Sequence, residues 1–288
     1  MNSNGIRTDL ALECFPEDEG YELPEGVTMS RRGEAFRITE IDIADDSCME
    51  TLGKGKGRYI TLEGGELSRF SPEYSDMAQE LAGELGQLVP EGDILVAGIG
   101  NSDITPDAVG PQTAARVLAT RHLQSELAGE DMEIFRSLRR VSVLAAGVLG
   151  QTGIETAELL RTVCGELRPA AVIAVDALAC SDISRLGTVI QLSDSGISPG
   201  SGVANSRREL SERTLGVPVI AAGVPTVADL RTIVRSFTGQ SVSSEGADMI
   251  VTPRDIDRLT ERASQLLAFG INLALHPALS FEDVRGLF

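Results

Sequence analysis

From Ser71 onward, short and mainly apolar runs alternate with segments whose apolar residues recur at helical spacing. The apolar runs lie at 93–100, 141–148, 171–176, 189–192 and 217–222. Runs of this kind are typical of strands covered on both faces of a sheet. Helical patterns at 154–167 and 227–234 separate several of them. The alternation predicts an α/β protein, a three-layer sandwich with a largely parallel central sheet.

Two segments carry sequence signals of a helix start. Ser71-Pro72-Glu73 has the form of an N-cap followed by proline at the first helical position, ahead of apolar residues spaced along one helical face up to Leu88. Thr252-Pro253-Arg254-Asp255 has the form of a capping box, and its helical pattern continues up to Pro277. We therefore expect helices to begin at both places.

The first 70 residues differ from the rest of the chain. They are rich in Glu, Asp and Gly, and helical periodicity is weak. Alternating apolar and polar residues at 36–43 and 58–62 indicate one or two strands. We expect residues 10–70 to form a small β-containing extension packed on a main α/β domain of residues 71–288.

Composition narrows the classes of function. The net charge of −18 disfavours a nucleic-acid partner. No apolar stretch reaches the roughly 20 residues of a membrane span, and the N-terminus has no apolar core of a secretory signal. The four cysteines form no Cys-x-x-Cys pair, which fits reduced thiols. We expect a cytoplasmic protein that binds neither nucleic acid nor membrane.

Two carboxylates follow apolar strands of the predicted sheet. Asp107 comes in a turn after the run 93–100, and Asp176 follows five apolar residues directly. Sites in open α/β sheets form at the carboxyl ends of strands. Paired carboxylates can share a proton, so that one acts as base toward water and the other as acid or electrostatic partner. The pair predicts peptide hydrolysis, although it could also hold a divalent metal.

Other catalytic classes have weaker support. Neither histidine, His122 or His276, has a serine or cysteine nucleophile motif beside it, and His276 could be a metal ligand only if the fold brought it next to Asp107 and Asp176. The segment that begins at Gly98 lacks the third glycine of a dinucleotide fingerprint. The loop 194–203 and the run Gly53-Lys54-Gly55-Lys56-Gly57 are not Walker loops. The glycines of the loop 194–203 either approach a substrate chain or form a tight turn.

Segments along nearly the whole chain resemble the germination protease family, the spore proteases of endospore-forming bacteria. They are Arg7-Thr8-Asp9-Leu10-Ala11-Leu12-Glu13, the stretch 98–111, Ala174-Val175-Asp176-Ala177-Leu178, the stretch 194–202, the stretch 216–227 and residues 251–277. They occur in the family's order. Each is weak alone, and together they are highly specific.

The resemblance implies an atypical aspartic-type endopeptidase, with Asp107 and Asp176 catalytic, that degrades small acid-soluble spore proteins at germination, in the forespore or spore core. It implies cleavage after an acidic and before an apolar residue, a homotetramer, and a phosphorylase/hydrolase-like fold similar to that of hydrogenase-maturation peptidases. It also implies a zymogen processed at Asp9–Leu10, with residues 1–9 as propeptide. Within the matching segments, the expected substrate-binding residues are Asn101, Asp194, Gly200, Ser201 and Gly202.

Two features depart from the family pattern: the propeptide has only nine residues, and the chain is short between Thr226 and Val251. No cofactor is expected, but a divalent metal stays open. One alternative is a metal-dependent maturation-type peptidase with Asp107, Asp176 and His276 as ligands. Another is a non-catalytic binding protein on the same fold.

Overall fold

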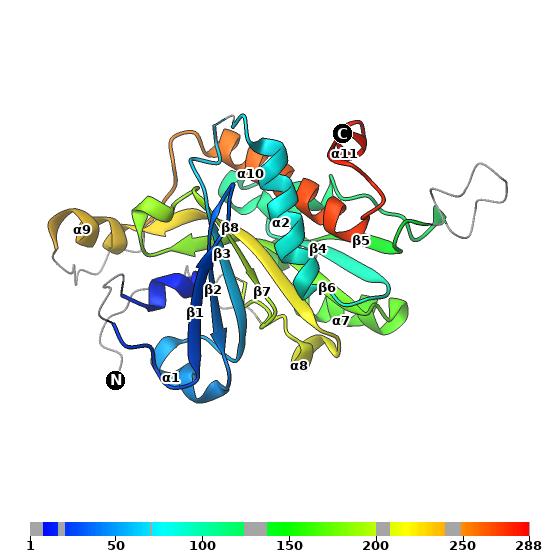
Figure 1. The fold of residues 1–288 in the computed structure, drawn as a ribbon. Coiled ribbons are helices and arrows are strands. Elements are labelled where there is room, and N and C mark those ends of the chain that lie inside the picture. Colours follow the sequence, from blue (N-terminus) through cyan, green and yellow to red (C-terminus); the bar gives the residue numbers. More distant parts are fainter. Residues whose placement is uncertain are drawn as a thin grey trace.

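The computed structural model describes residues 8–16, 21–69, 71–123, 137–199, 208–239 and 249–287. In these residues the chain forms one sheet in the order β1-β2-β3-β7-β8-β6-β4-β5, with β9 paired to β8 (Figure 1). The strands are β1 (Val27–Arg32), β2 (Arg37–Ile43), β3 (Gly57–Glu63), β4 (Ile94–Ile99), β5 (Val141–Gly147), β6 (Ala171–Cys180), β7 (Val189–Ser193), β8 (Val219–Asp229) and β9 (Ile250–Val251).

The helices of the described residues cover both faces of this sheet. They are α1 (Met49–Leu52), α2 (Tyr74–Leu88), α3 (Val109–Ala114), α6 (Leu149–Thr152), α7 (Thr156–Leu167), α8 (Glu212–Leu215), α9 (Leu230–Thr238), α10 (Ile256–Leu275) and α11 (Phe281–Arg285). Short 3-10 turns are η1 (Ala11–Cys14), η2 (Asp46–Cys48), η3 (Thr105–Asp107) and η5 (Ile183–Arg185). The predicted α/β class is confirmed.

The sheet is mixed rather than largely parallel. Strands β5, β4, β6 and β8 run parallel to one another, whereas β7, β3, β2 and β1 continue the sheet by antiparallel pairing. The antiparallel direction of β7 was not predicted, because apolar runs such as Val189–Ser193 mark burial on both faces and carry no information about direction.

The N-terminal strands belong to this same sheet. Strand β3 pairs with β7 from Tyr59↔Ser193 to Glu63↔Val189, so the sheet runs through the boundary expected near residue 70. The predicted strands at 36–43 and 58–62 are confirmed as β2 and β3. Strand β1 was not predicted, because its burial pattern is mostly exposed and its sequence lacks an apolar stripe.

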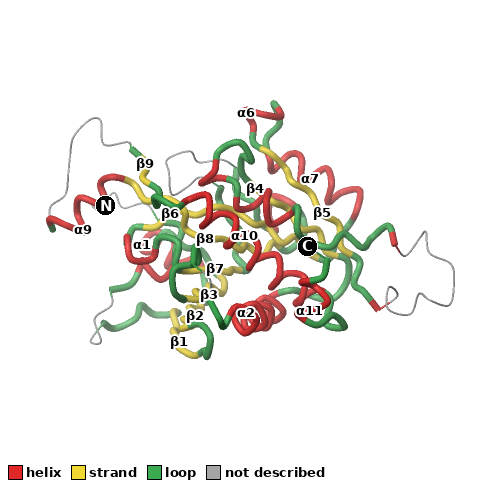
Figure 2. The backbone as a smooth tube through the Cα atoms, turned by 90° about the horizontal axis from the view of Figure 1, so that it is seen from above, coloured by secondary structure: helices red, strands yellow, loops and turns green. Residues whose placement is uncertain are grey.

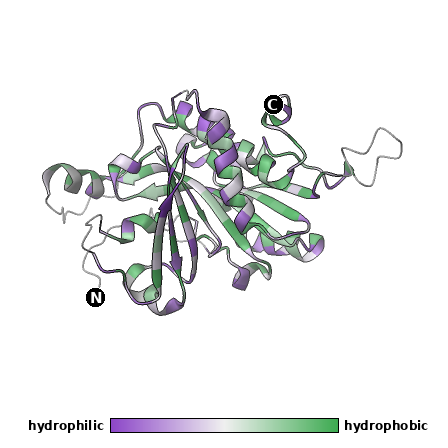
Figure 3. Ribbon diagram, in the orientation of Figure 1, coloured by the Kyte–Doolittle hydropathy of each residue, from purple (hydrophilic) through white to green (hydrophobic). Residues whose placement is uncertain are grey.

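Three layers result. Helices α2, α3, α10 and α11 pack on one face, and α7, α8 and the N-terminal segment lie on the other (Figure 2). The first interface is built around β6 residues Ile173 and Val175 with α10 residues such as Leu267. The second contains Val172 and Ala174 of β6. The central strands are accordingly mostly hydrophobic in Figure 3, while α2 carries hydrophilic bands.

The helix starts differ from the sequence expectations. Helix α2 begins at Tyr74, with Glu73 as N-cap, so Pro72 lies before the helix; Ser71 Oγ accepts the N–H of Glu73 instead. Helix α10 begins at Ile256, after Asp255, without a side-chain cap. The helix expected at 227–234 begins at Leu230, because β8 continues to Asp229 and pairs there with β9.

Close packing at two glycines brings α3 against the sheet. A Cβ on Gly110 of α3 would lie 2.2 Å from the carbonyl oxygen of Ile99 and 2.3 Å from that of Val175. A Cβ on Gly98 of β4 would lie 2.3 Å from the carbonyl oxygen of Gly110. Helix α3 and the turn before it are therefore fixed directly over the ends of the β4–β6 pairing.

No helix in the described ranges has the length and hydropathy to cross a membrane.

Replacing Gly110 by alanine should destabilise the protein, because the added methyl group would force α3 off the two strands. Overpacking of this kind costs typically about 1–3 kcal/mol, and two backbone oxygens that cannot move aside favour the upper end. Urea unfolding measures the loss. The matched control is Gly86→Ala on α2, where a Cβ meets nothing within 4 Å, so stability should rise by up to about 1 kcal/mol. Equal midpoints for the two variants would contradict this packing.

Candidate active site

Asp176 stands where β6 runs past its neighbour β4. The last pair between these strands is Gly98↔Val175, and β6 continues alone beside β8 up to Cys180. The side chain of Asp176 shares its sheet face with Ala174 and Leu178, because alternate residues of a strand point the same way. Asp176 is only 4% exposed, and its Oδ1 accepts the N–H of Ala177 at 2.9 Å. A carboxylate buried within a strand is held for a purpose other than solubility.

Asp107 is the last residue of η3, the turn that follows β4. Its Oδ2 accepts the backbone N–H of Asn101 at 2.7 Å. Gly100 lies beside Asp107 and has a φ of +117. A Cβ at this position would clash with the backbone carbonyl oxygen of Asp107, so only glycine fits there. This hydrogen bond closes the loop between β4 and η3 and leaves the half-buried Asp107 over the carboxyl end of β4.

Two hydroxyl groups tie the η3 turn to the rest of the protein. Thr226 Oγ1 of β8 donates to the carbonyl oxygen of Pro106 at 2.7 Å, and Thr260 Oγ1 of α10 donates to that of Thr105 at 3.1 Å. The turn also packs against β6. The structure thus brings Asp107 to the end of the sheet at which Asp176 lies. Two carboxylates in this arrangement can divide the roles of general base and acid.

Asn101 has a positioning role in the described contacts. Besides its N–H bond to Asp107, its Oδ1 accepts Gln151 Nε2 at 2.6 Å and the N–H of Asp103 at 2.9 Å. Its side chain therefore braces the loop that carries Asp107. A direct contact with substrate stays a prediction.

Asp194 lies away from the η3 turn that carries Asp107. It follows β7, whose Ser193 pairs with Ala221 near the start of β8, whereas Thr226 of β8 holds the η3 turn. Five residues of strand, roughly 17 Å, separate these levels. The Asp194 carboxylate accepts the N–H of Arg58 at 2.7 Å and so ties β7 to β3. The other expected substrate-binding residues, Gly200, Ser201 and Gly202, lie outside the described residues.

His276 does not join the aspartates. Thr260, near the start of α10, touches the η3 turn, and His276 caps the other end of this helix. Sixteen helical residues span roughly 24 Å. His276 is instead fully buried near Leu118 and Arg139. Within the described part of the chain, no three His, Cys, Asp or Glu side chains cluster as metal ligands.

The bond expected to be processed lies on the face of the sheet that carries Asp176. The N–H of Asp9 donates to the carbonyl oxygen of Ala179 at 2.9 Å, and Asp9 Oδ2 accepts the N–H of Ala179 at 2.8 Å. Leu10 is completely buried with Leu178 and Cys180. Leu178 and Asp176 are two residues apart on one face, a distance of roughly 7 Å between Cα atoms.

Beyond this bond, Glu13 anchors the N-terminal segment. Its buried carboxylate accepts the N–H and Oγ of Ser181, both at 2.6 Å, and the N–H of Asp182 at 2.9 Å. Thr8 Oγ1 donates to the same carboxylate, and Arg185 lies at 3.8 Å. The segment is therefore held on one side of the Asp9–Leu10 bond by β6 and on the other by the turn that follows this strand.

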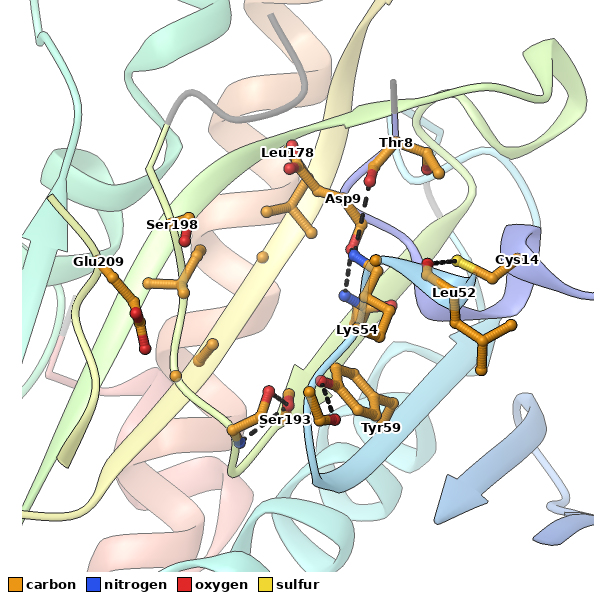
Figure 4. Close-up of a pocket in the computed structure, with 18 of the residues that line it drawn as sticks. Thr8, Asp9, Cys14, Leu52, Lys54, Tyr59, Leu178, Ser193, Ser198 and Glu209 are labelled. Carbon is orange, nitrogen blue, oxygen red and sulfur yellow. Dashed lines mark hydrogen bonds between the residues drawn. The ribbon is translucent and has the colours of Figure 1, made fainter. Parts of the chain in front are cut away.

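A cavity of about 840 Å³ opens beside this segment (Figure 4). Its wall includes Asp9, Lys54, Leu178, Gln191 and Gly223. Neither Asp107 nor Asp176 lines it. Because Gly223 pairs with Asp176 and Leu178 follows on the same face, the floor of the cavity borders Asp176.

The sequence analysis missed Glu13, Lys54 and Gln191 as site residues. A signal was present for two of them. Gln191 is the one polar residue in the run Val189-Ile190-Gln191-Leu192, and Lys54 lies within the glycine-lysine run 53–57. A polar side chain in a strand buried on both faces needs a hydrogen-bond partner, so its presence there indicates a specific contact.

In this α/β sheet one carboxylate lies in the loop after a parallel strand, and a second, buried one lies on the neighbouring strand just beyond the end of their pairing. Two carboxylates so placed are the kind of site that hydrolases use for acid–base catalysis. A family model described as germination protease matches residues 11–240. The chain belongs to the germination protease family and is a peptidase.

Curated relatives agree with this assignment. The germination protease of Clostridium tetani is 35% identical, covering 97% of this chain and 98% of its own. That of Caldanaerobacter subterraneus is 38% identical over 98% of each chain. That of Bacillus cereus is 36% identical over 99% of this chain and 78% of its own. Among solved structures, the hydrogenase maturation protease HycI of Thermococcus kodakarensis aligns at a TM-score of 0.35 and 19% identity, covering 64% of this chain and 96% of its own.

Replacement of Glu13 by glutamine should destabilise the protein by about 2–3 kcal/mol, because an amide cannot accept from all the donors that now converge on the buried carboxylate. Urea unfolding at neutral pH measures the change. Glu282→Gln is the matched control, since its ion pair with Arg285 is 65% exposed and should contribute less than about 1 kcal/mol. Equal losses in the free energy of unfolding of the two variants would show that the Glu13 contacts stabilise the protein no more than an exposed ion pair does.

Burial lowers the pKa of His276 to about 4 from an ordinary 6.5. Between these values the unfolded chain binds a proton that the folded chain does not. The free energy of unfolding should therefore fall as the pH drops from about 6.5 to about 4, by about 3 kcal/mol for this group. Urea unfolding across this range, compared between wild type and His276→Leu, isolates the contribution. Parallel pH profiles would contradict it.

Proposed function

We propose that this chain is an endopeptidase that begins the degradation of small acid-soluble spore proteins at germination. It cleaves after Glu or Asp and before an apolar residue. It is made as a zymogen that removes residues 1–9 by cutting its own Asp9–Leu10 bond. Asp107 and Asp176 are the catalytic groups of an atypical aspartic-type site. The enzyme acts in the forespore or spore core as a homotetramer.

One observation carries this proposal. The Asp9–Leu10 bond, an acidic residue followed by an apolar one, lies on the face of β6 that presents Asp176, in the chain's own structure. Leu10 fills an apolar site formed by Leu178, Cys180 and Val189. The segment thus presents itself as a substrate would.

The chemistry follows from the two carboxylates. One accepts a proton from water as the water attacks the carbonyl carbon, and the other gives a proton to the departing amine of Leu10. Each carboxylate accepts a backbone N–H, Asp107 from Asn101 and Asp176 from Ala177, so burial is what distinguishes them. Asp176 is the more deeply buried of the two, and burial favours the neutral acid. Asp107 is accordingly the base and Asp176 the acid in this proposal.

The metal-dependent alternative loses its third ligand in this geometry, because His276 is at the far end of α10. The non-catalytic alternative is decided by activity. The proposed tetramer is checked by sedimentation equilibrium, which distinguishes one chain from four.

Intact mass spectrometry tests the function. Purified wild type should lose residues 1–9 and should cut a small acid-soluble spore protein into fragments that end in Glu or Asp. Asp107→Asn and Asp176→Asn should each slow both reactions by about 10³-fold or more, because each removes a proton-transfer group. Asp76→Asn, an exposed residue of the first turn of α2, is the matched control and should behave as wild type. Undiminished cleavage by Asp176→Asn would refute the assignment.

A further inference from the structure

The carbonyl oxygen of Asp9 accepts two hydrogen bonds from side chains. Lys54 Nζ donates to it at 2.8 Å, and Gln191 Nε2 donates to it at 2.8 Å. These donors come from distant parts of the chain, the loop between α1 and β3 and the middle of β7. In Figure 4, Asp9 and Lys54 lie next to each other in the wall of the cavity. The oxygen so held belongs to the bond that the proposed function has the protein cut.

The orientation of the Gln191 amide is fixed from both of its ends. Its Oε1 accepts the N–H of Ala11 at 2.6 Å while its Nε2 donates to Asp9. Gln191 is 8% exposed and its strand is held between β3 and β8. The Gln191 side chain therefore forms hydrogen bonds with the backbone on both sides of the Asp9–Leu10 bond. Its NH₂ group cannot rotate away from Asp9 without breaking the hydrogen bond with Ala11.

Lys54 is presented by the loop 53–57. Gly53 ends α1 in the left-handed region, at φ +68, and the carbonyl oxygen of Gly55 accepts the hydroxyl of Tyr59 at 2.8 Å. The loop is thereby pinned to β3. The Lys54 ammonium also lies 3.5 Å from the carbonyl oxygen of Thr8. Lys56, two residues on, is exposed, and it is the backbone N–H of Lys56 that bonds to Asp46.

We propose that Lys54 and Gln191 form an oxyanion-binding pair that stabilises the negative charge on the Asp9 carbonyl oxygen during hydrolysis of the Asp9–Leu10 bond. The inference rests on the proposed processing function and adds two catalytic residues to it. A cation and a neutral donor aimed at one oxygen are suited to developing negative charge, and such donors are more effective away from bulk water.

The reaction balances without any further reactant. Water oxygen bonds to the carbonyl carbon of Asp9, one water proton goes to the basic carboxylate, and the π electrons of the carbonyl move to its oxygen. Lys54 and Gln191 hold that oxyanion. It then reforms the double bond as the bond to Leu10 N breaks, and the acidic carboxyl group protonates this nitrogen. The products are a new α-carboxylic acid at Asp9 and an amine at Leu10, and transfer of the acid's proton to the amine gives the carboxylate and the ammonium group.

The same pair is placed to serve a second peptide. Lys54 and Gln191 both line the cavity, together with Asp9. Once residues 1–9 leave, the two donors face the cavity, where the carbonyl oxygen of an acidic residue of a protein substrate takes the place of that of Asp9. Self-processing and substrate cleavage then use one set of donors.

The rate of loss of residues 1–9, followed by intact mass, tests this pair. Lys54→Met should slow processing by about 10²-fold or more, the usual effect of removing one oxyanion donor. Lys54→Arg keeps the charge and donors and should recover part of the rate. Gln191→Glu keeps an acceptor for Ala11 but turns an oxygen toward the Asp9 carbonyl, and should slow processing at least as much. Lys56→Met, on the same loop, should process as wild type.

A second measurement does not depend on turnover. In Asp176→Asn chains, which should stay uncut, the carbonyl carbon of Asp9 is labelled with carbon-13 and its NMR resonance recorded. Lys54→Met and Gln191→Glu should each move this resonance, because each removes a donor from the oxygen, whereas Lys56→Met should not. Urea unfolding midpoints confirm that every variant is folded.

The outcomes separate the two proposals. Processing of wild type but not of Asp176→Asn, with Lys54→Met as fast as wild type, overturns the oxyanion pair and leaves the function standing. Absence of processing in wild type counts against the function, and the carbonyl resonance then decides the pair alone. A resonance that neither Lys54→Met nor Gln191→Glu moves overturns it.

Discussion

The site depends on a difference in length between two neighbouring strands. Strand β4 ends at Ile99, and its pairing with β6 ends at Val175. From Asp176 to Cys180, β6 continues without β4 beside it. The glycine contacts between α3 and both strands set where this divergence occurs. Where β4 leaves, its loop turns back to hold Asp107, and the N-terminal segment takes hydrogen bonds at Ala179. The carboxylates and the bond they are proposed to cut therefore meet at one place.

Much of this arrangement was predictable from local sequence. Mainly apolar runs mark the buried strands, since a strand covered on both faces has no polar alternation. Asp107 lies in the loop after β4, as its place after an apolar run predicted. Asp176 was expected at the end of its strand, but β6 continues to Cys180, and Asp176 lies just beyond the end of the pairing with β4. The family resemblance supplied the roles of these residues and the position of the Asp9–Leu10 bond, which no spacing argument provides.

The rest depends on long-range pairing. The antiparallel half of the sheet, built on β3 and β7, joins residues more than a hundred positions apart, and strand direction leaves no trace in an apolar run. Gln191 forms hydrogen bonds with Asp9 and Ala11 across a similar separation in sequence. Its role could not be predicted because only the fold brings β7 next to the N-terminal segment. His276 shows the reverse case: a residue that chemistry nominates as a ligand lies at the wrong end of a long helix.

The two sides of the Asp9–Leu10 bond are attached by different kinds of contact. On the carboxyl side, Leu10 and Ala11 are completely buried and Glu13 is locked to the turn after β6. On the amino side, the described anchors are confined to Thr8 and Asp9. Hydrolysis here would leave the residues after the cut as part of the core, while the described residues before it would keep hydrogen bonds to the rest of the protein. Because hydrolysis of a peptide bond in water is effectively irreversible, the protein would pass only once from one covalent form to the other.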